Sequence, residues 1–362
     1  MIIGVPAETK SGETRVALTP AGAQELVGRG HRVVVEAGAG RRAGIPDDAM
    51  AAAGARIGAV GEAWACELVL KVKEPQPEEH HLLRDNVLFT FLHLAAGPAL
   101  ADALRAAGTT ALSYDTVQLD DGTLPLLAPM SEIAGRLAVL AGAHHLLSPA
   151  GGRGVLLGGV PGVPGARVVV LGAGVAGSHA IAQAAGLGAD VTALDVSLSA
   201  LRRLDARFGG RVRTVSSTAH AVAEEVRAAD LVIGAVLVPG RRAPRVLTRA
   251  MIETMPAGSV LVDIAVDQGG CIEGTVPTTH ADPVRPVAGS LLYSVANMPA
   301  AVGVTATRAL TNATLPYVLA LADGPDAALD RDPALRRGVN VRGGRIVHPE
   351  VAQALGEVAG SA

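Results

Sequence analysis

Aromatic residues are scarce in this chain, which has three Phe, three Tyr and one Trp among its 362 residues. Surfaces that bind nucleic acids combine basic clusters with stacking aromatic rings. The chain has neither, and its formal net charge is −3. We therefore expect no nucleic-acid partner, and we expect Ala, Val and Leu to pack the cores, because 49% of the residues are hydrophobic.

Cysteines and long apolar runs are also few. Cys66 and Cys271 stand alone without CxxC spacing, which argues against a disulfide framework or a metal site and predicts two buried thiols. Gly, Pro or a charged residue interrupts every apolar run before the roughly 18 residues that a membrane span needs. Charged residues follow the first short apolar run at once, unlike a secretory signal. We expect no membrane partner and a cytoplasmic location.

Glycines, in contrast, are abundant, and three of them form the most informative motif. The apolar run that begins at Val168 leads into Gly172, Gly174 and Gly177, and the next apolar run ends at Asp195. In a dinucleotide site the three glycines allow the tight turn, the approach of the pyrophosphate and close helix packing. A carboxylate at the position of Asp195 binds the ribose hydroxyls and repels a 2′-phosphate. The motif therefore predicts NAD as the cofactor.

Short β-rich runs alternate with helical patterns along most of the chain, which predicts an α/β fold with largely parallel sheets. The strand runs are nearly continuous in apolar residues, as in sheets that helices cover on both faces. A helical pattern over 131–147 separates two such series. We expect two Rossmann-like domains: a discontinuous substrate domain over 1–126 and 305–362, and an NAD-binding domain over 127–304.

Ligands of open α/β sheets bind beyond the carboxyl ends of the strands, so polar residues there are site candidates. Arg15, Lys73, His93 and Asp267 each follow or end a predicted strand. The guanidinium of Arg15 suits a carboxylate, although for this residue taken alone a solvated loop arginine is the more common case. The imidazole of His93 is either a hydrogen-bonded core residue or a general acid and base.

In two pairs of nearby residues, the sequence favours one member as the site residue. Lys71 and Lys73 point to the same face of an apparently buried strand, so at least one should meet an acid or a ligand, and Lys73 is favoured because it lies nearer the strand end. Asp267, beside two glycines, is favoured over Asp263, which lies within a strand. Asn297 either binds the nicotinamide carboxamide or only forms a turn. Four other histidines are interpreted as ordinary surface or linker residues: His80, His81, His144 and His145.

Longer strings carry a family resemblance over residues 1 to about 323. They include GVPAETKSGETRVALTP, LVLKVKEP, LFTFLHLAA, LPLLAPMSEIAGRLA, LGAGVAG, DLVIGAVLVPG, VLVDIAVDQGGC and VANMP. On these strings the chain resembles the alanine dehydrogenases, whose superfamily includes the alpha part of the proton-translocating nicotinamide nucleotide transhydrogenase. A transhydrogenase would need membrane segments or a partner subunit, which favours the dehydrogenase.

The resemblance implies a role for each matching position. Arg15 and Lys73 would hold the substrate carboxylate and carbonyl oxygen, His93 would shuttle a proton, and Asp267 would activate the water that hydrolyses an iminium. The resemblance also implies a homo-hexamer. The implied cofactor contacts beyond the glycines are Ser131, Val175, Ala176, Asp195, Val236, Leu237, Ile264, Ala265, Val266, Asp267, Val295, Ala296, Asn297 and Met298.

The implied reaction is the reversible oxidative deamination of L-alanine to pyruvate and ammonium, with hydride transfer to NAD and no metal. The chain departs from the family pattern over Ala300–Thr307, at Ala200 and at Val276, where the cofactor or the substrate pocket would be affected. Two alternatives therefore stay open. One is a related dehydrogenase for another small amino or oxo acid, and the other is a non-catalytic NADH-responsive binding protein.

Overall fold

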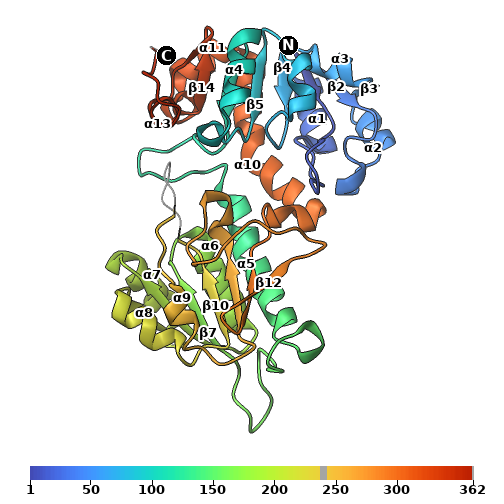
Figure 1. Cartoon of the computed structure of the whole chain (residues 1–362). Helices are drawn as coiled ribbons and strands as arrows, with labels where there is room; N and C mark the ends of the chain where they lie inside the picture. Colours follow the sequence, from blue (N-terminus) through green and yellow to red (C-terminus); the bar gives the residue numbers. More distant parts are fainter. Residues whose placement is uncertain (237–242, 361–362) are drawn as a thin grey trace. The chain divides into compact units, whose positions relative to one another are not determined.

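The computed structural model describes residues 1–236 and 243–360. The chain divides into two compact units: unit 1 is Met1–Met130 with Ala300–Ala362, and unit 2 is Ser131–Pro299. Each unit has its own sheet (Figure 1). None of the helices in the described residues combines the length and the apolar character that a membrane crossing needs.

Unit 1 is built on an eight-stranded sheet of order β15-β14-β6-β5-β4-β1-β2-β3. Its strands are β1 (Ile2–Val5), β2 (Arg32–Glu36), β3 (Arg56–Gly58), β4 (Leu68–Leu70), β5 (Val87–Thr90), β6 (Thr110–Ser113), β14 (Val339–Arg342) and β15 (Arg345–Ile346). Its helices are α1 (Pro20–Gly28), η1 (Arg41–Ala43), α2 (Asp47–Ala52), α3 (Val60–Trp64), η2 (Pro77–Leu82), η3 (Leu94–Ala96), α4 (Pro98–Ala107), α10 (Gly303–Asp323), α11 (Pro325–Arg331), α12 (Pro333–Arg337) and α13 (Pro349–Ala354).

The first six strands of unit 1 pair in parallel, and the two C-terminal strands add to the β6 edge in antiparallel fashion. Figure 1 shows β2 and β3 in blue at one edge, with α1, α2 and α3 beside them, and β14, α11 and α13 in red at the other. The parallel arrangement places the segments that follow β1, β4, β5 and β6 at one edge of the sheet.

Unit 2 is built on a seven-stranded sheet of order β12-β13-β11-β10-β7-β8-β9. Its strands are β7 (Arg167–Leu171), β8 (Asp190–Asp195), β9 (Val212–Ser216), β10 (Leu231–Gly234), β11 (Val260–Asp263), β12 (Val284–Val287) and β13 (Ser290–Tyr293). Its helices are η4 (Ser148–Ala150), α6 (Val175–Gly186), α7 (Leu198–Phe208), α8 (Ala219–Val226), α9 (Arg249–Ile252) and η5 (Ile264–Gln268); α5 (Ala128–His145) and η6 (Met298–Val302) cross the unit boundaries.

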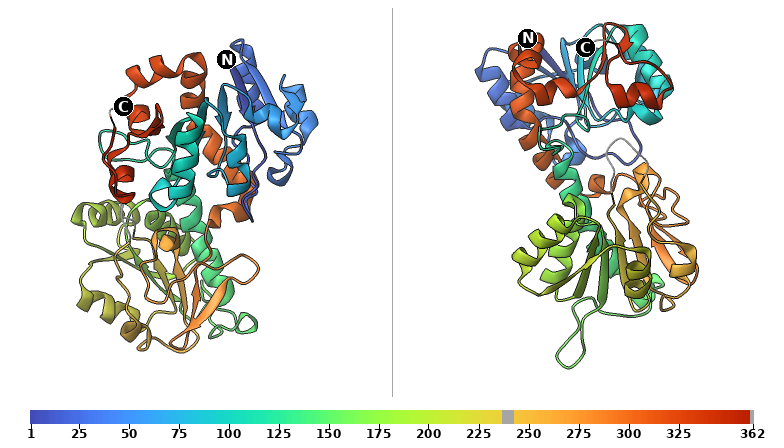
Figure 2. Two further views of the ribbon diagram at one scale, coloured as in Figure 1. Left: turned by 45° about the horizontal axis from the view of Figure 1, so that its top comes forward. Right: turned by 90° about the vertical axis from the view of Figure 1, so that its left-hand side faces the viewer.

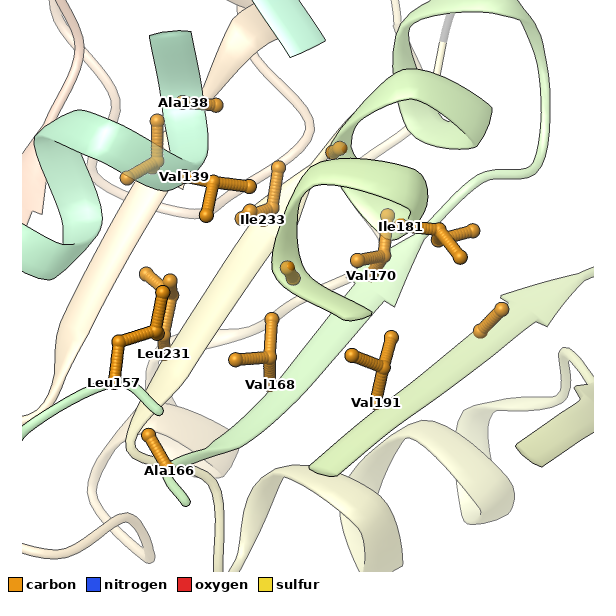
Figure 3. Packing of buried hydrophobic residues seen from close by; sticks show 14 of the residues in the cluster. Ala138, Val139, Leu157, Ala166, Val168, Val170, Ile181, Val191, Leu231 and Ile233 are labelled. Atoms are coloured by element: carbon orange, nitrogen blue, oxygen red, sulfur yellow. The ribbon is translucent and has the colours of Figure 1, made fainter. Parts of the chain in front are cut away.

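Helices cover both faces of the unit 2 sheet (Figure 2). Side chains of a strand alternate between the two faces. Figure 3 shows Val168 and Val170 of β7 on the face where Val139 of α5 and Ile181 of α6 also lie. The other face holds a second cluster, which includes Val169 and Leu171 of the same strand and Val222 and Val226 of α8. This two-sided burial is the physical reason that β7 is apolar at every position from Val168 to Leu171.

The predicted α/β fold with two parallel-dominated sheets is confirmed. The sequence analysis did not predict β3, β12, β14 or β15, which are short or lie at sheet edges, and β12, β14 and β15 run antiparallel. The helix predicted over 131–147 spans Ala128–His145.

Three other predictions of detail were wrong. Strands β4 and β5 end at Leu70 and Thr90, so Lys73 and His93 lie in the loops beyond them rather than at strand ends. His145, taken for a surface residue, is 8% exposed and packs near Tyr293. Burial and the neighbouring His144 lower the pKa of His145, so this ring favours the neutral form.

Gly135 in α5 gives a direct test of the helix packing. A Cβ at this position would lie 2.1 Å from the carbonyl oxygen of Ala176 in α6. Gly135→Ala should therefore lower the stability of unit 2 by about 1–3 kcal/mol, although alanine is the better helix former. Thermal unfolding followed by calorimetry measures the change.

Gly186 in α6 is the matched control, because a Cβ there meets no atom within 4 Å. Gly186→Ala should leave stability unchanged or raise it by about 0.4–1 kcal/mol. Equal unfolding temperatures for the two variants would contradict the close approach of α5 to α6.

Candidate active site

The glycine-rich turn between β7 and α6 has the geometry that a pyrophosphate requires. Gly172 adopts a φ of +104°, and a Cβ there would lie 2.6 Å from the carbonyl oxygen of Ala235. A Cβ at Gly177 would lie 1.9 Å from the carbonyl oxygen of Gly172, so the first turn of α6 packs directly on the bend. At Gly174 nothing lies within 4 Å of a Cβ, which leaves the approach to the N-terminus of α6 open.

Asp195 at the end of β8 joins this turn to the next strand. Its two carboxylate oxygens accept hydrogen bonds from the backbone N–H groups of Ala173, at 2.6 Å, and Ser197, at 2.7 Å. The side chain is thus held beside the glycine turn, where the motif requires the ribose-binding acid. The three glycines and Asp195 together fit a bound dinucleotide.

The other predicted cofactor contacts of unit 2 follow neighbouring parallel strands. Strands β7, β10, β11 and β13 are adjacent in register, so the segments after them lie along one sheet edge. Asn297 adopts a φ of +58° in the segment after β13, and Ser131 lies in the first turns of α5. Leu237 lies outside the described residues. The edge segments hold Val236, Ile264, Ala265, Val266, Asp267, Val295, Ala296, Asn297 and Met298.

Asp263 and Asp267 differ as the sequence suggested. Asp263 is fully buried and accepts hydrogen bonds from Ala265 N, Ile272 N and Thr275 Oγ1, and burial raises its pKa. Asp267 is exposed in η5. Asp263 therefore shapes the loop after β11, whereas the carboxylate of Asp267 is accessible to a ligand.

Arg15 in unit 1 is buried, so the alternative of a solvated loop arginine is wrong. It is 2% exposed, and its Nε and Nη2 donate to the two carboxylate oxygens of Glu13 at 2.7 and 2.5 Å. A third nitrogen, Nη1, lies 2.9 Å from the sulfur of Met130. Glu13 therefore fixes the plane of the guanidinium, which matches the bidentate geometry of such pairs.

Lys73 and His93 lie together beyond the ends of the adjacent strands β4 and β5. Lys73 Nζ is 3.4 Å from His93 Nε2, and His93 Nδ1 is 3.3 Å from Asp115 Oδ2. His93 has a φ of +50°, and its side chain is 41% exposed, so the alternative of a core histidine is wrong. The ring stacks on Phe91, with centroids 5.9 Å apart. Each ring nitrogen of His93 thus faces a different ionisable group.

Asp115 completes this row of side chains after β6. Burial raises its pKa, but His93 and the hydroxyl of Ser113 more than offset that effect and hold the pKa at about 2. Asp115 is therefore a carboxylate at neutral pH, and it favours a proton on the Nδ1 of His93. That arrangement leaves Nε2, on the side of Lys73, for exchange with a ligand.

The sequence analysis missed the carboxylates that hold these bases. Lys71 meets two of them: its Nζ lies 3.3 Å from Glu8 Oε2 and 3.1 Å from Glu79 Oε1. Glu8, Glu13 and Asp115 come from loops after β1 and β6. A buried charge is costly without a partner of opposite charge. This cost, which applies to the lysines, applies equally to these acids and could have identified them.

Comparison with known proteins places this architecture in a family. The sequence model described as "Alanine dehydrogenase/PNT, N-terminal domain" matches residues 4–134, and "Alanine dehydrogenase/PNT, C-terminal domain" matches 138–349. The chain is 54% identical over 360 residues to the alanine dehydrogenase of Mycobacterium tuberculosis, covering 98% of this chain and 97% of that relative. The chain belongs to the alanine dehydrogenase family.

Other members of the family are similar over their whole length. The alanine dehydrogenase of Bacillus subtilis is 50% identical, covering 98% of this chain and 95% of the relative. A solved L-alanine dehydrogenase superposes with a TM-score of 0.95 at 50% identity, covering 98% and 99% of the two chains. A transhydrogenase from Sinorhizobium meliloti has a TM-score of 0.82 at 30% identity, covering 96% and 99%.

The contact between His93 and Asp115 predicts a dependence of stability on pH. The pKa of Asp115 lies below its ordinary value of 3.8, so the pair stabilises the fold above about pH 4, and the effect is lost as the pH falls toward 2. Asp115→Asn should therefore lower the free energy of unfolding by about 2 kcal/mol at neutral pH and by less at pH 3. Urea unfolding from pH 3 to pH 7 measures both. A loss that is independent of pH would contradict the pairing.

Proposed function

We propose that this protein is an NAD-dependent alanine dehydrogenase that interconverts L-alanine, NAD⁺ and water with pyruvate, ammonium, NADH and a proton. The observation that carries the proposal is the row Lys73–His93–Asp115 at the carboxyl edge of the unit 1 sheet. It combines a cation for an oxo acid with an oriented proton carrier. Membership of the alanine dehydrogenase family supports the same reaction.

NAD fits the residues that unit 2 presents. Gly172, Gly174 and Gly177 would hold the pyrophosphate, Asp195 the ribose, and Asn297 the carboxamide. When bound, the nicotinamide supplies the acceptor for the hydride. Support for this assignment comes from the collisions that a Cβ would cause at Gly172 and Gly177 and from the open space at Gly174.

Unit 1 would bind the substrate. The guanidinium of Arg15, already oriented by Glu13, would hold the carboxylate of alanine or pyruvate, and Lys73 Nζ would contact the oxygen at the reacting carbon. Both side chains are nearly buried, at 2% and 7% exposed, so charge interactions with a small anion are stronger there than in bulk water.

His93 would move the proton. Asp115 favours the tautomer with hydrogen on Nδ1, so Nε2 accepts a proton from the amine or from the attacking water and returns it in the reverse reaction. Asp267 of unit 2 would activate the water that attacks the iminium. The expected hexamer and the expected cytoplasmic location stay predictions.

A kinetic assay tests the substrate assignment. Purified protein with pyruvate, ammonium and NADH should turn over with a higher kcat/KM than with glyoxylate or 2-oxobutyrate as the oxo acid. A higher value for another acid would identify a related dehydrogenase. Binding of NADH without turnover of any acid would instead identify a binding protein.

Substitution of His93 tests the proton carrier. His93→Ala should lower kcat by about 10²- to 10⁴-fold, because general acid and base catalysis is lost, while NADH binding stays unchanged. His81, an exposed histidine of η2, provides the control, and His81→Ala should keep full activity. Full activity of His93→Ala would remove His93 from the mechanism.

Substitution of Asp195 tests the preference for NADH over NADPH. Asp195→Ala removes the acceptor for the ribose, so the Kd for NADH should rise about tenfold or more and the preference over NADPH should shrink. Asp190 lies exposed at the amino end of the same strand, and Asp190→Ala should leave both values unchanged. Titration of protein fluorescence or calorimetry with each cofactor measures them. An unchanged preference in Asp195→Ala would contradict the role.

A further inference from the structure

Residues 71–73 continue the pairing of β4 with β5 but not its pairing with β1. Toward β5, Lys71 N donates to Phe89 O at 3.2 Å and Phe91 N donates to Val72 O at 3.1 Å. Toward β1, the register of paired residues ends with Gly4 opposite Val69, and Pro6, just after β1, has no N–H group. The N–H groups of Val72 and Lys73 are not part of the pairing with β1 and therefore need another acceptor.

The carboxylate of Glu8 supplies that acceptor. Its Oε1 accepts from Val72 N at 2.6 Å, and its Oε2 accepts from Lys73 N at 3.1 Å. On the other side of the same residue, Thr90 Oγ1 donates to Lys73 O at 3.0 Å. Thr90 is the last residue of β5 and is fully buried. The backbone of Lys73 is thus held at both its N–H and its carbonyl group.

Glu8 is itself held by buried charge. The residue is 4% exposed, and its Oε2 lies 3.3 Å from the ammonium of Lys71, which is fully buried. Glu79 is the second partner of Lys71 but makes its backbone hydrogen bond to Gln76 N instead, at 2.7 Å. Glu8 is therefore the acid of this pair that accepts a hydrogen bond from the backbone of Lys73.

We propose that Glu8 is a positioning residue for substrate binding: its carboxylate, held by Lys71, takes the place of a missing strand neighbour and fixes the backbone from which Lys73 reaches toward His93. The inference rests on the proposed role of Lys73 in binding the oxo acid. A shift of that backbone would move Nζ away from the substrate oxygen, and binding of small anions depends strongly on such placement.

Steady-state kinetics of three variants test the proposal. In Glu8→Gln the amide has one oxygen and an NH₂ group, so at most one of the two backbone N–H groups keeps a good acceptor. We expect the KM for pyruvate to rise about tenfold or more, with the Kd for NADH within about twofold of the wild type. Glu8→Asp keeps the charge on a shorter side chain and should recover part of the loss.

Glu79→Gln is the matched control, because it also removes a buried charge beside Lys71 but leaves the bonds to Val72 and Lys73 intact. Its KM for pyruvate should stay within about twofold of the wild type, even if its unfolding temperature falls as far as that of Glu8→Gln. Equal rises of KM in both variants, or a wild-type KM in Glu8→Gln, would overturn the proposal. If Glu8→Gln does not fold, Glu8→Asp is compared with Glu79→Gln by the same criterion.

Hydrogen exchange separates this proposal from the proposed function. In the folded variants, the amides of Val72 and Lys73 should exchange faster in Glu8→Gln or Glu8→Asp than in Glu79→Gln, whether or not the protein oxidises alanine. Equal exchange rates refute the positioning role. A wild-type protein that does not turn over pyruvate or alanine refutes the proposed function, and the exchange rates then still decide the role of Glu8.

Discussion

The parallel register of β4, β5 and β6 is the constraint on which the candidate site depends. Each of Lys73, His93 and Asp115 follows the end of one of these strands, and none is close to the others in sequence. The pairs Leu70–Phe89 and Thr90–Ser113 fix where neighbouring strands end. Because the strands are side by side and point the same way, the loops after them place the ammonium, the imidazole and the carboxylate in one row.

Buried charge beneath this row would be costly if it were not paired. Lys71 lies between Glu8 and Glu79; burial lowers its pKa, but these carboxylates more than offset that effect, so the pKa is raised overall and the amine stays protonated. Burial raises the pKa of Glu8, while Lys71 and the N–H groups of Val72 and Lys73 oppose that rise. The network therefore replaces backbone pairing at a place where β1 has already ended.

Local patterns predicted the fold and part of the site. The spacing of Gly172, Gly174 and Gly177 predicted the turn between β7 and α6, because a Cβ at Gly172 or Gly177 would collide with a backbone carbonyl oxygen and Gly174 leaves open space. Same-face alternation predicted that at least one of Lys71 and Lys73 meets an acid or a ligand, and Lys71 contacts two acids. The sequence could not identify the acids that contact these side chains. Glu8 lies on a loop after β1 and Asp115 on a loop after β6, and contacts between distant loops leave no periodic signal in one sequence. For the same reason the short strands β14 and β15 were not predicted.

The two units hold their candidate ligand-binding groups in place in different ways. In unit 2 the candidate binding element is the turn itself: Gly174 leaves space, and Asp195 accepts hydrogen bonds from Ala173 N and Ser197 N, so that the turn keeps its shape. A change at Asp195 is therefore expected to act on the proposed ribose contact and on the turn together. In unit 1 the candidate binding elements are charged side chains, and each is held by a second group. Glu13 holds Arg15, Asp115 holds His93 and Glu8 holds the backbone of Lys73, so the precision of this site depends on carboxylates that need not touch the substrate.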